Sequence, residues 1–220
     1  CHRREVRYTD TGGGDDTATF DVDDGSDTLA GYQLDISIVP ANRIPIAVDR
    51  GHYITFDGAS NEHIETANDA DLRFDDTDAF TVELWFRADA VAGEQVLLAK
   101  ADSDAVPANY LIQVSDDSGT PYVEFTTSYT STTSVTVTST TEVAAGNWYH
   151  VAAVYDGVER LLYVNGVKED FTSDSNDDIY RSGSDGVTVG ALSGGARAFS
   201  GAIDDIRIWD DVRSEHEIKT

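Results

Sequence analysis

Carboxylates are the most abundant reactive side chains in this sequence, which contains 41 Asp and Glu residues among 220. Glycoside hydrolysis uses two carboxyl groups that face one cleft, and on a strand such groups would stand two positions apart. Glu83 is instead followed at this spacing by Trp85 and then Arg87. Glu124 is likewise flanked two positions away by uncharged residues. The sequence also lacks the G-x-S-x-G motif of a serine nucleophile. We therefore expect that the protein is not an enzyme.

The histidines do not form a zinc-binding pattern. Zinc sites are built from closely spaced His and Cys ligands. None of the five histidines is spaced as H-x-H or H-x-x-x-H, and the chain has one cysteine. We expect His150, within the segment WYHVA, to be a hydrogen-bonded structural residue.

Calcium is the metal that the abundant oxygen ligands favour, because it binds six to eight carboxylate and carbonyl oxygens. In the segment Ala202–Trp209, strict alternation puts Asp204 on the same strand face as Ile206 and Ile208. A buried carboxylate must be paired, hydrogen-bonded or metal-bound. Asp204, and with it Asp57, are therefore candidate ligands of one structural Ca²⁺. The alternative is that Asp204 caps a neighbouring loop without metal, and the sequence leaves both open.

Aromatic side chains are the candidates for ligand binding, because an exposed ring can stack on a sugar. Four tyrosines on predicted strands or hairpins are candidate ligand-binding residues: Tyr110, Tyr122, Tyr129 and Tyr163. Cross-strand or core packing is the alternative for each of them. Both roles are open for Trp85, whereas Trp148 and Trp209 are predicted to pack in or near the core.

Short strands must position these side chains, because turn signals interrupt the sequence repeatedly from Gly51 onward. Asn165-Gly166 and Asp156-Gly157 predict hairpin turns, since these residue types tolerate positive φ. Many short strands joined by such turns are typical of a sandwich or jelly roll. The predicted strands are Tyr53–Phe56, Phe80–Ala88, Gln95–Lys100, Tyr110–Val114, Tyr122–Thr127, Ser134–Thr138, Trp148–Tyr155, Arg160–Val164, Gly186–Gly190 and Ala202–Trp209.

The strand predicted over Phe80–Arg87 illustrates the expected layering. Apolar residues alternate there with Thr, Glu, Trp and Arg, so one face should contact the core and the other should face outward. One helix is expected at the C-terminus, where Ser214 and Glu217 form an S-x-x-E capping box. The Ser- and Thr-rich segment Thr126–Thr141 predicts a solvent-facing hairpin, with an O-glycosylated stretch as the alternative.

Residues 1–50 differ from the remainder, residues 51–220. They contain the acidic, Gly-rich stretch Thr11–Asp27 and the alternating run Tyr32–Val39. Alternation predicts a half-buried strand. We expect an N-terminal strand-rich arm or docking subdomain in front of the main domain.

The charge balance restricts the partners and the setting of the protein. Its net charge of -26, with 15 Lys and Arg, argues against binding to nucleic-acid phosphates. An Asp-rich, Lys-poor folded chain is suited to molar salt, where self-repulsion is screened. A halophilic source is the expectation, and a calcium-loaded extracellular protein is the alternative.

One cysteine excludes an internal disulfide, and no apolar run reaches the roughly 18 residues of a membrane helix. Cys1 is either a lipidated N-terminus or the start of a piece of a longer chain.

Seven blocks in order carry a family resemblance: YITFDG (53–58), FTVELWFRAD (80–89), LLAK (97–100), NWYHVAAVYDG (147–157), LYVNG (162–166), VGAL (189–192) and FSGAIDDIRIWDDVRSEHEI (199–218). Residues 51–218 therefore resemble the laminin G-like domains of the concanavalin A-like lectin and glucanase superfamily. The resemblance implies an all-β fold, a two-sheet antiparallel jelly-roll sandwich. It also implies binding functions toward carbohydrates or surface proteins. Asp204 matches the Asp of superfamily members that bind a structural calcium.

These observations predict a non-catalytic recognition or adhesion module displayed on the surface of a halophilic cell or virus, or secreted. Its expected partner is a cell-surface glycan or protein, with no nucleic acid and no membrane insertion of this segment. The alternative is a structural virion or surface-layer subunit, such as a decoration, turret or fibre protein, docked through its N-terminal arm. A homo-oligomer or larger assembly is expected in the second case.

Overall fold

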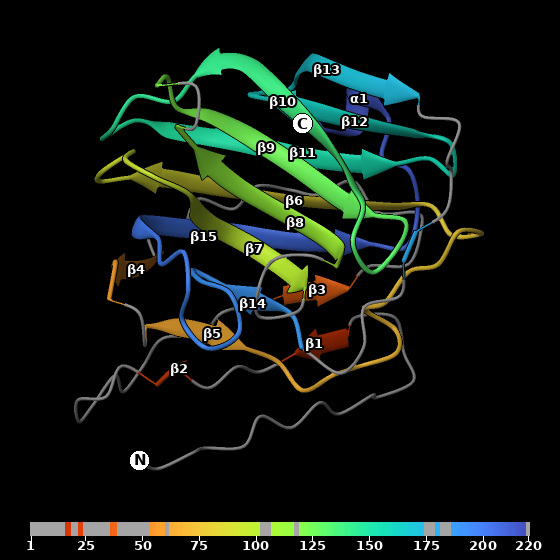
Figure 1. The fold of residues 1–220 in the computed structure, drawn as a ribbon, viewed down its shortest axis with the longest axis horizontal. Helices are drawn as coiled ribbons and strands as arrows, with labels where there is room; N and C mark the ends of the chain where they lie inside the picture. Colours follow the sequence, from red (N-terminus) through yellow and green to blue (C-terminus); the bar gives the residue numbers. More distant parts are fainter. Residues whose placement is uncertain are drawn as a thin grey trace.

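The structure, a computed structural model, describes residues 53–59, 62–101, 107–116, 119–173, 179–180 and 186–218. It also describes the backbone of three strands at 16–18, 22–23 and 36–38. Almost all regular structure in this part of the chain is β-strand, arranged in two sheets packed face to face (Figure 1). Among the described strands the pairs are antiparallel, except that β3 (Ile36–Ile38) runs parallel to β15 (Ser200–Trp209). The predicted two-sheet jelly-roll sandwich is confirmed.

The first sheet has eight strands in the described residues and is called the eight-strand sheet. Its order is β1-β3-β15-β6-β11-β12-β13, and β4 also pairs with β15. The bounds are β1 Asp16–Ala18, β3 Ile36–Ile38, β4 Ile54–Asp57, β6 Phe80–Ala88, β11 Trp148–Tyr155, β12 Glu159–Val164, β13 Val167–Ser173 and β15 Ser200–Trp209.

The second sheet, the seven-strand sheet, has the order β10-β9-β8-β7-β14-β5-β2 in the described residues. It crosses in front of the eight-strand sheet in Figure 1. The bounds are β2 Val22–Asp23, β5 His63–Glu65, β7 Gln95–Ala101, β8 Ala108–Ser115, β9 Tyr122–Ser128, β10 Ser134–Glu142 and β14 Thr188–Val189.

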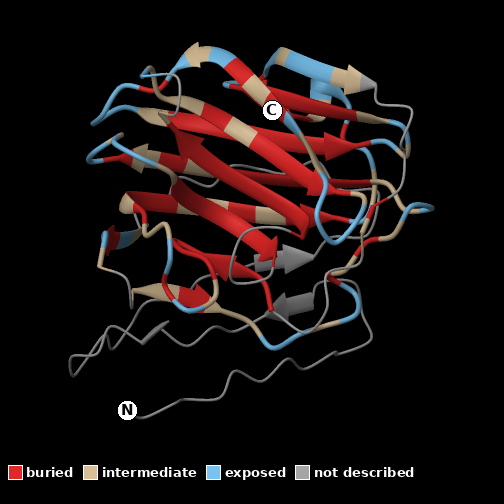
Figure 2. Cartoon of the chain, viewed as in Figure 1, coloured by how far each residue is buried: buried red, intermediate tan, exposed pale blue. Residues whose placement is uncertain are grey.

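The core lies between the two sheets, whose central strands are buried along their length (Figure 2). The four apolar residues predicted to face inward from β6, Phe80, Val82, Leu84 and Phe86, are all fully buried. Phe80 anchors an aromatic cluster, with its ring centroid 4.5 Å from that of Phe74. Alternation in the sequence therefore identified both faces of this strand.

Local turn and cap signals are also confirmed. Asn165 and Gly166 join β12 to β13 with φ values of 51° and 74°, as a two-residue hairpin of this composition requires. The helix α1 spans Glu215–Ile218, and the Ser214 hydroxyl contacts Glu217 Oε2 at 2.7 Å. No helix in the described residues is long and apolar enough to span a membrane.

The three described strands before residue 51 pair with both sheets. β3 lies parallel to β15, and β1 pairs with β3 at one edge of the eight-strand sheet. β2 pairs with β5 at an edge of the seven-strand sheet. Most of the predicted arm, including the greater part of Thr11–Asp27, lies outside the described residues.

A β-bulge in β15 changes the face on which Asp204 lies. Asp204 is opposite Trp85 and Arg207 is opposite Glu83, so β15 advances three residues while β6 advances two. The extra residue is Asp205, with φ of 49°. The prediction that Asp204 shares a face with Ile206 and Ile208 is therefore wrong. The isoleucines pack in the core, whereas Asp204 lies on the outer face with Trp85.

Candidate functional site

A connected group of polar side chains lies on the outer face of the seven-strand sheet. Gln113 of β8 is directly opposite Glu124 of β9, and its Nε2 donates to Glu124 Oε2 at 2.8 Å and to Glu94 Oε1 at 3.3 Å. Arg197 completes the group, because its Nη1 donates to Gln113 Oε1 at 2.8 Å. Its Nη2 lies 3.0 Å from Glu94 Oε2. We call Glu94, Gln113, Glu124 and Arg197 the Gln113 network.

The backbone fixes the network before any ligand arrives. Arg197 belongs to the loop between β14 and β15 and has φ of 54°, and its carbonyl accepts a hydrogen bond from the Val96 N–H at 2.9 Å. Leu192 of the same loop packs on the outer face of the sheet with Val96 and Leu111. The loop therefore covers part of this face and holds the guanidinium over the remainder.

Tyr122 extends the network along β9. It stands two residues before Glu124, so both side chains are on the same face of the sheet, and Tyr122 is half-buried. Gln113 is only 3% exposed, whereas the ion-paired side chains of Arg197 and Glu94 are 28% and 31% exposed. A buried amide thus anchors accessible charged groups beside an aromatic ring. Amide, carboxylate and guanidinium groups hydrogen-bond to hydroxyls, and a phenol ring offers an apolar face.

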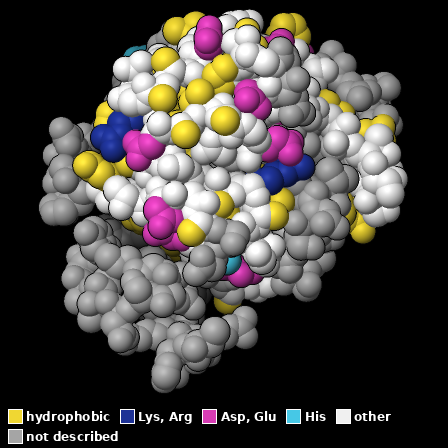
Figure 3. Space-filling view, turned by 60° about the vertical axis from the view of Figure 1, so that its left-hand side comes forward, with side chains coloured by type: hydrophobic (Ala, Val, Ile, Leu, Met, Phe, Trp, Pro, Cys, Tyr) yellow, Lys and Arg dark blue, Asp and Glu magenta, His cyan; other side chains and the backbone are white. Residues whose placement is uncertain are grey.

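The surface at this end of the sandwich mixes both signs of charge despite the acidic composition. Figure 3 brings the left-hand side of Figure 1 forward and shows Lys and Arg side chains directly beside Asp and Glu. Opposite charges in contact offset each other, so this surface does not present an unbroken negative field.

A second polar cluster is buried on the outer face of the eight-strand sheet. Glu83 of β6 is only 2% exposed. Its Oε2 lies 3.3 Å from His150 Nε2, and its Oε1 lies 3.4 Å from Arg207 Nη1. Trp209 Nε1 donates to the same Oε1 at 3.0 Å. The structural role predicted for His150 is confirmed, since it ties β11 to β6.

The partners of Glu83 determine its ionisation. Burial alone raises the pKa of this carboxyl, but the hydrogen bond and charge of His150, with Arg207 and Trp209, hold the pKa below its ordinary value. Both oxygens are engaged by protein groups. Glu83 therefore stabilises the sheet and is not exposed for binding or catalysis.

Three side chains, Tyr53 just before β4, Arg87 of β6 and Trp148 of β11, meet on the same outer face. The rings of Tyr53 and Trp148 are 5.6 Å apart, at an interplanar angle of 64°. The Arg87 guanidinium lies 5.6 Å from the Tyr53 ring and 5.5 Å from the Trp148 ring. Trp148 is partly exposed and points outward, so the prediction that it packs in or near the core is wrong. Trp209 is buried, as predicted.

The two candidate calcium ligands do not form one site. Asp57 is opposite Ser200, four residues before Asp204 on β15, which corresponds to roughly 13 Å along the strand. Asp57 Oδ1 accepts from the Ala59 N–H at 2.7 Å, and Asp204 Oδ1 accepts from the Asp205 N–H at 2.9 Å. Among the described residues no group of three or more His, Cys, Asp or Glu side chains is placed to hold a metal. Calcium binding by either Asp with other ligands stays a prediction.

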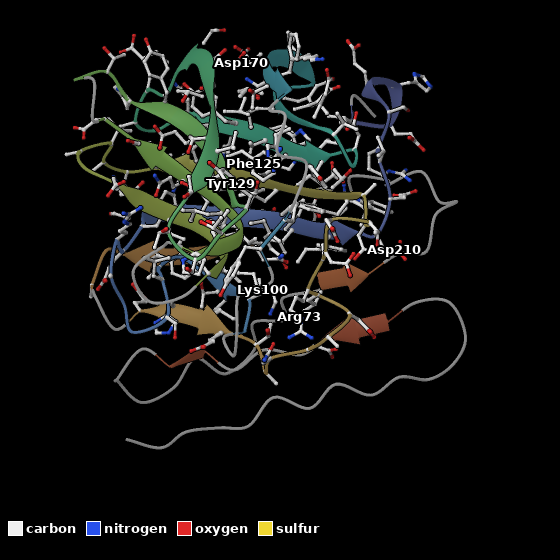
Figure 4. All side chains as sticks on the ribbon, turned by 45° about the vertical axis from the view of Figure 1, so that its right-hand side comes forward. Arg73, Lys100, Phe125, Tyr129, Asp170 and Asp210 are labelled. Carbon is white, nitrogen blue, oxygen red and sulfur yellow. The ribbon has the colours of Figure 1, made fainter. Side chains whose placement is uncertain are left out.

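The four candidate tyrosines have different surroundings. Tyr110 is fully buried, burial raises the pKa of its hydroxyl, and this hydroxyl donates to the Leu72 carbonyl at 2.9 Å. Tyr163 is buried against residues that include Ile218 of α1. The prediction that these two rings face a ligand is wrong. Tyr122 and Tyr129 are half-buried, and Figure 4 shows Tyr129 at the loop between β9 and β10. Ligand binding by this pair stays a prediction.

Sequence reasoning missed most of the Gln113 network. Arg197 and Gln113 are 84 residues apart, and no local pattern joins them. The available signal was Gln113 itself, a polar residue within the apolar strand YLIQV, which marks the outer face of β8.

Comparison with known families gives a match over most of the chain. A laminin G family model, described as the concanavalin A-like lectin/glucanases superfamily, matches residues 57–219. No curated protein sequence matches the chain.

Several solved structures are similar in fold. A protein from Bacteroides ovatus, described as a candidate carbohydrate binding protein, has a TM-score of 0.58 at 22% identity; the match covers 76% of this chain and 45% of that one. The CBM40 domain of the Ruminococcus gnavus IT-sialidase, bound to α2,3-sialyllactose, has a TM-score of 0.57 at 16% identity. The match covers 76% of this chain and 95% of that domain. Domain 4 of an extracellular arabinanase from Geobacillus stearothermophilus, in complex with arabinotriose, has a TM-score of 0.58 at 16% identity. The match covers 79% of this chain and 78% of that domain. This chain thus spans less than half of the Bacteroides protein.

Proposed function

Because the chain belongs to the concanavalin A-like lectin/glucanases superfamily, we propose that it is a non-catalytic carbohydrate-binding module. The observation that carries the proposal is the Gln113 network with Tyr122 on the outer face of the seven-strand sheet. The ring of Tyr122 would stack on the apolar face of a sugar. The exposed edges of Glu94, Glu124 and Arg197 would bind its hydroxyls.

Similar folds that hold sugars support this proposal. The sialidase domain was solved with a sialylated trisaccharide and the arabinanase domain with arabinotriose. Since the identities are only 16%, these structures support the class of ligand and not the sugar.

The arrangement of the carboxylates favours binding over hydrolysis. Glu94 and Glu124 both accept from the amide nitrogen of Gln113, which therefore lies between them. A scissile glycosidic bond would have to occupy that position, between the acid and its partner carboxylate. Glu83, the other carboxylate considered above, is buried and fully engaged.

The acidic composition supports a setting in concentrated salt. A net charge of -26 keeps a folded chain soluble there, and the Debye length is then roughly 3 Å at 1 M. The proposed function is thus recognition or adhesion by a module displayed on a halophilic cell or virus. Its partner would be a surface glycan.

A printed array of neutral and carboxylated oligosaccharides tests the function. We expect the wild-type chain to bind at least one immobilised glycan. Tyr122→Ala should weaken that binding about tenfold or more, because the stacked ring is lost. Phe171→Ala is the matched control, since it removes an exposed aromatic side chain from β13 of the other sheet, and it should bind as the wild type does. A wild-type protein that binds no glycan, or equal loss in both variants, contradicts the proposal. Hydrolysis of any bound oligosaccharide contradicts its non-catalytic part.

A further inference from the structure

We propose a second sugar-binding surface on the outer face of the eight-strand sheet, formed by Tyr53, Arg87 and Trp148 and specific for uncharged sugar rings. The inference rests on the proposed function and extends it, because the second surface lies on the sheet opposite the Gln113 network. A module with two such surfaces bridges two glycan chains.

The register of the strands explains why these three side chains meet. Arg87 is directly opposite Trp148 on one side and Ala202 on the other, and Ala202 is opposite Thr55 of β4. Tyr53 immediately precedes β4 on the same outer face. Ala202 has only a methyl group and is fully buried although it faces outward. Larger side chains therefore lie over it from both sides.

The side chains of the cluster can stack on a sugar ring and bind its hydroxyls. Tyr53 is 40% exposed, and its ring meets that of Trp148 at 64° rather than stacking flat upon it. An apolar ring surface is therefore left for the C–H face of a pyranose or furanose ring. The guanidinium of Arg87 is held against both aromatic rings, which restricts its rotamers and presents its N–H groups in a fixed direction.

The charge of the cluster favours an uncharged ligand. Arg87 Nε lies 3.8 Å from Asp89 Oδ1, and the Asp89 side chain is 58% exposed. The cation is thus accompanied by an accessible carboxylate. A ligand carboxylate would have to displace Asp89 from the guanidinium. Sugar hydroxyls, by contrast, can donate to Asp89 and accept from Arg87 together.

The positions of the two surfaces determine the consequence for binding. The outer faces of a two-sheet sandwich point in opposite directions. Both cannot engage one flat glycan layer, so no gain in avidity is expected on a planar surface. Two separate chains or particles can be held at once, and the monomer then acts as a cross-linker.

The test uses the full chain and the same printed array of neutral and carboxylated oligosaccharides. In a Tyr122→Ala background, we expect residual binding to neutral spots. Adding Tyr53→Ala should weaken this residual binding at least about tenfold. Adding Phe171→Ala should not, since Phe171 is an exposed aromatic residue on β13, outside this cluster. Arg87→Lys keeps the charge but loses the planar guanidinium group, and it should also weaken residual binding at an unchanged Tm.

Beads coated with the best neutral glycan should be agglutinated by the wild type and not by either single tyrosine variant.

Each of the other possible results refutes a defined part of the proposal. If Tyr122→Ala alone removes binding to every spot, the second surface does not exist, while the proposed function stands. If the residual spots that depend on Tyr53 are carboxylated, the assignment to uncharged sugars is wrong. If Tyr122→Ala/Tyr53→Ala binds every glycan as tightly as the wild type does, neither surface binds glycan. If the wild type binds no spot, the proposed function and the second surface both fail.

Discussion

Replacing Glu83 with glutamine tests the buried polar cluster that joins β6, β11 and β15. The substitution keeps the size of the side chain and an oxygen that can accept from Trp209 Nε1, now at 3.0 Å. It removes the charge that faces His150 at 3.3 Å and Arg207 at 3.4 Å. Glu83→Gln therefore removes the charge and one of the two acceptor oxygens of the cluster.

The expected loss follows from burial. Removing one partner of a buried ion pair costs about 3–5 kcal/mol, because the other charge is left uncompensated. Here the lower end applies, since Arg207 also lies 3.5 Å from Asp205 and the tryptophan keeps its acceptor. A loss of about 3 kcal/mol corresponds to a fall in Tm of roughly 6–12 °C for a domain of this size.

Thermal unfolding followed by circular dichroism at neutral pH measures this loss. The control is Asp89→Asn, which breaks the exposed contact with Arg87 at 3.8 Å and should cost less than about 0.5 kcal/mol. A Glu83→Gln variant that melts within about 2 °C of the wild type would refute the reasoning.

The difference in Tm between the wild type and Glu83→Gln should depend on pH. The pKa of Glu83 is lower in the folded protein than its ordinary value of 4.5. Its ionised form thus contributes stability that is present above pH 4.5 and is lost as the pH falls through the lower folded-state value. The difference in Tm between wild type and variant should therefore shrink on acidification.

Three further predictions concern other features of the chain. Glu169 of β13 accepts hydrogen bonds from Thr140 and Thr141 of β10. Partial burial raises the pKa of Glu169, but these hydrogen bonds outweigh it, so the pKa is lower than its ordinary value. Glu169→Gln should lower the Tm at pH 7 by a few degrees, and a difference that grows as the pH falls below its ordinary value of 4.5 would contradict this account. If Asp204 binds structural calcium, added CaCl₂ should raise the Tm of the wild type and leave Asp204→Asn unchanged; equal Tm values in chelator and in calcium would remove the site. The net charge of -26 predicts a Tm that rises between roughly 0.1 M and about 2 M KCl, and a constant Tm would argue against adaptation to salt.

Several local patterns were read correctly from the sequence. The inward and outward faces of β6, the Asn165-Gly166 turn and the Ser214 cap each depend on residues within a few positions of one another. The face of Asp204 was misread because a bulge at Asp205 interrupts the alternation. A bulge is selected by the pairing of two strands, and one strand's sequence does not display it.

The sequence by itself determined the all-β sandwich, because a period of two and turn chemistry are properties of neighbouring residues. Only the tertiary structure decided which side chains meet. Arg197 reaches Gln113 from a loop 84 residues away, and Tyr53 meets Trp148 across β15 and β6. Both contacts depend on strand order and register, which are determined by the packing of the two sheets on one shared core.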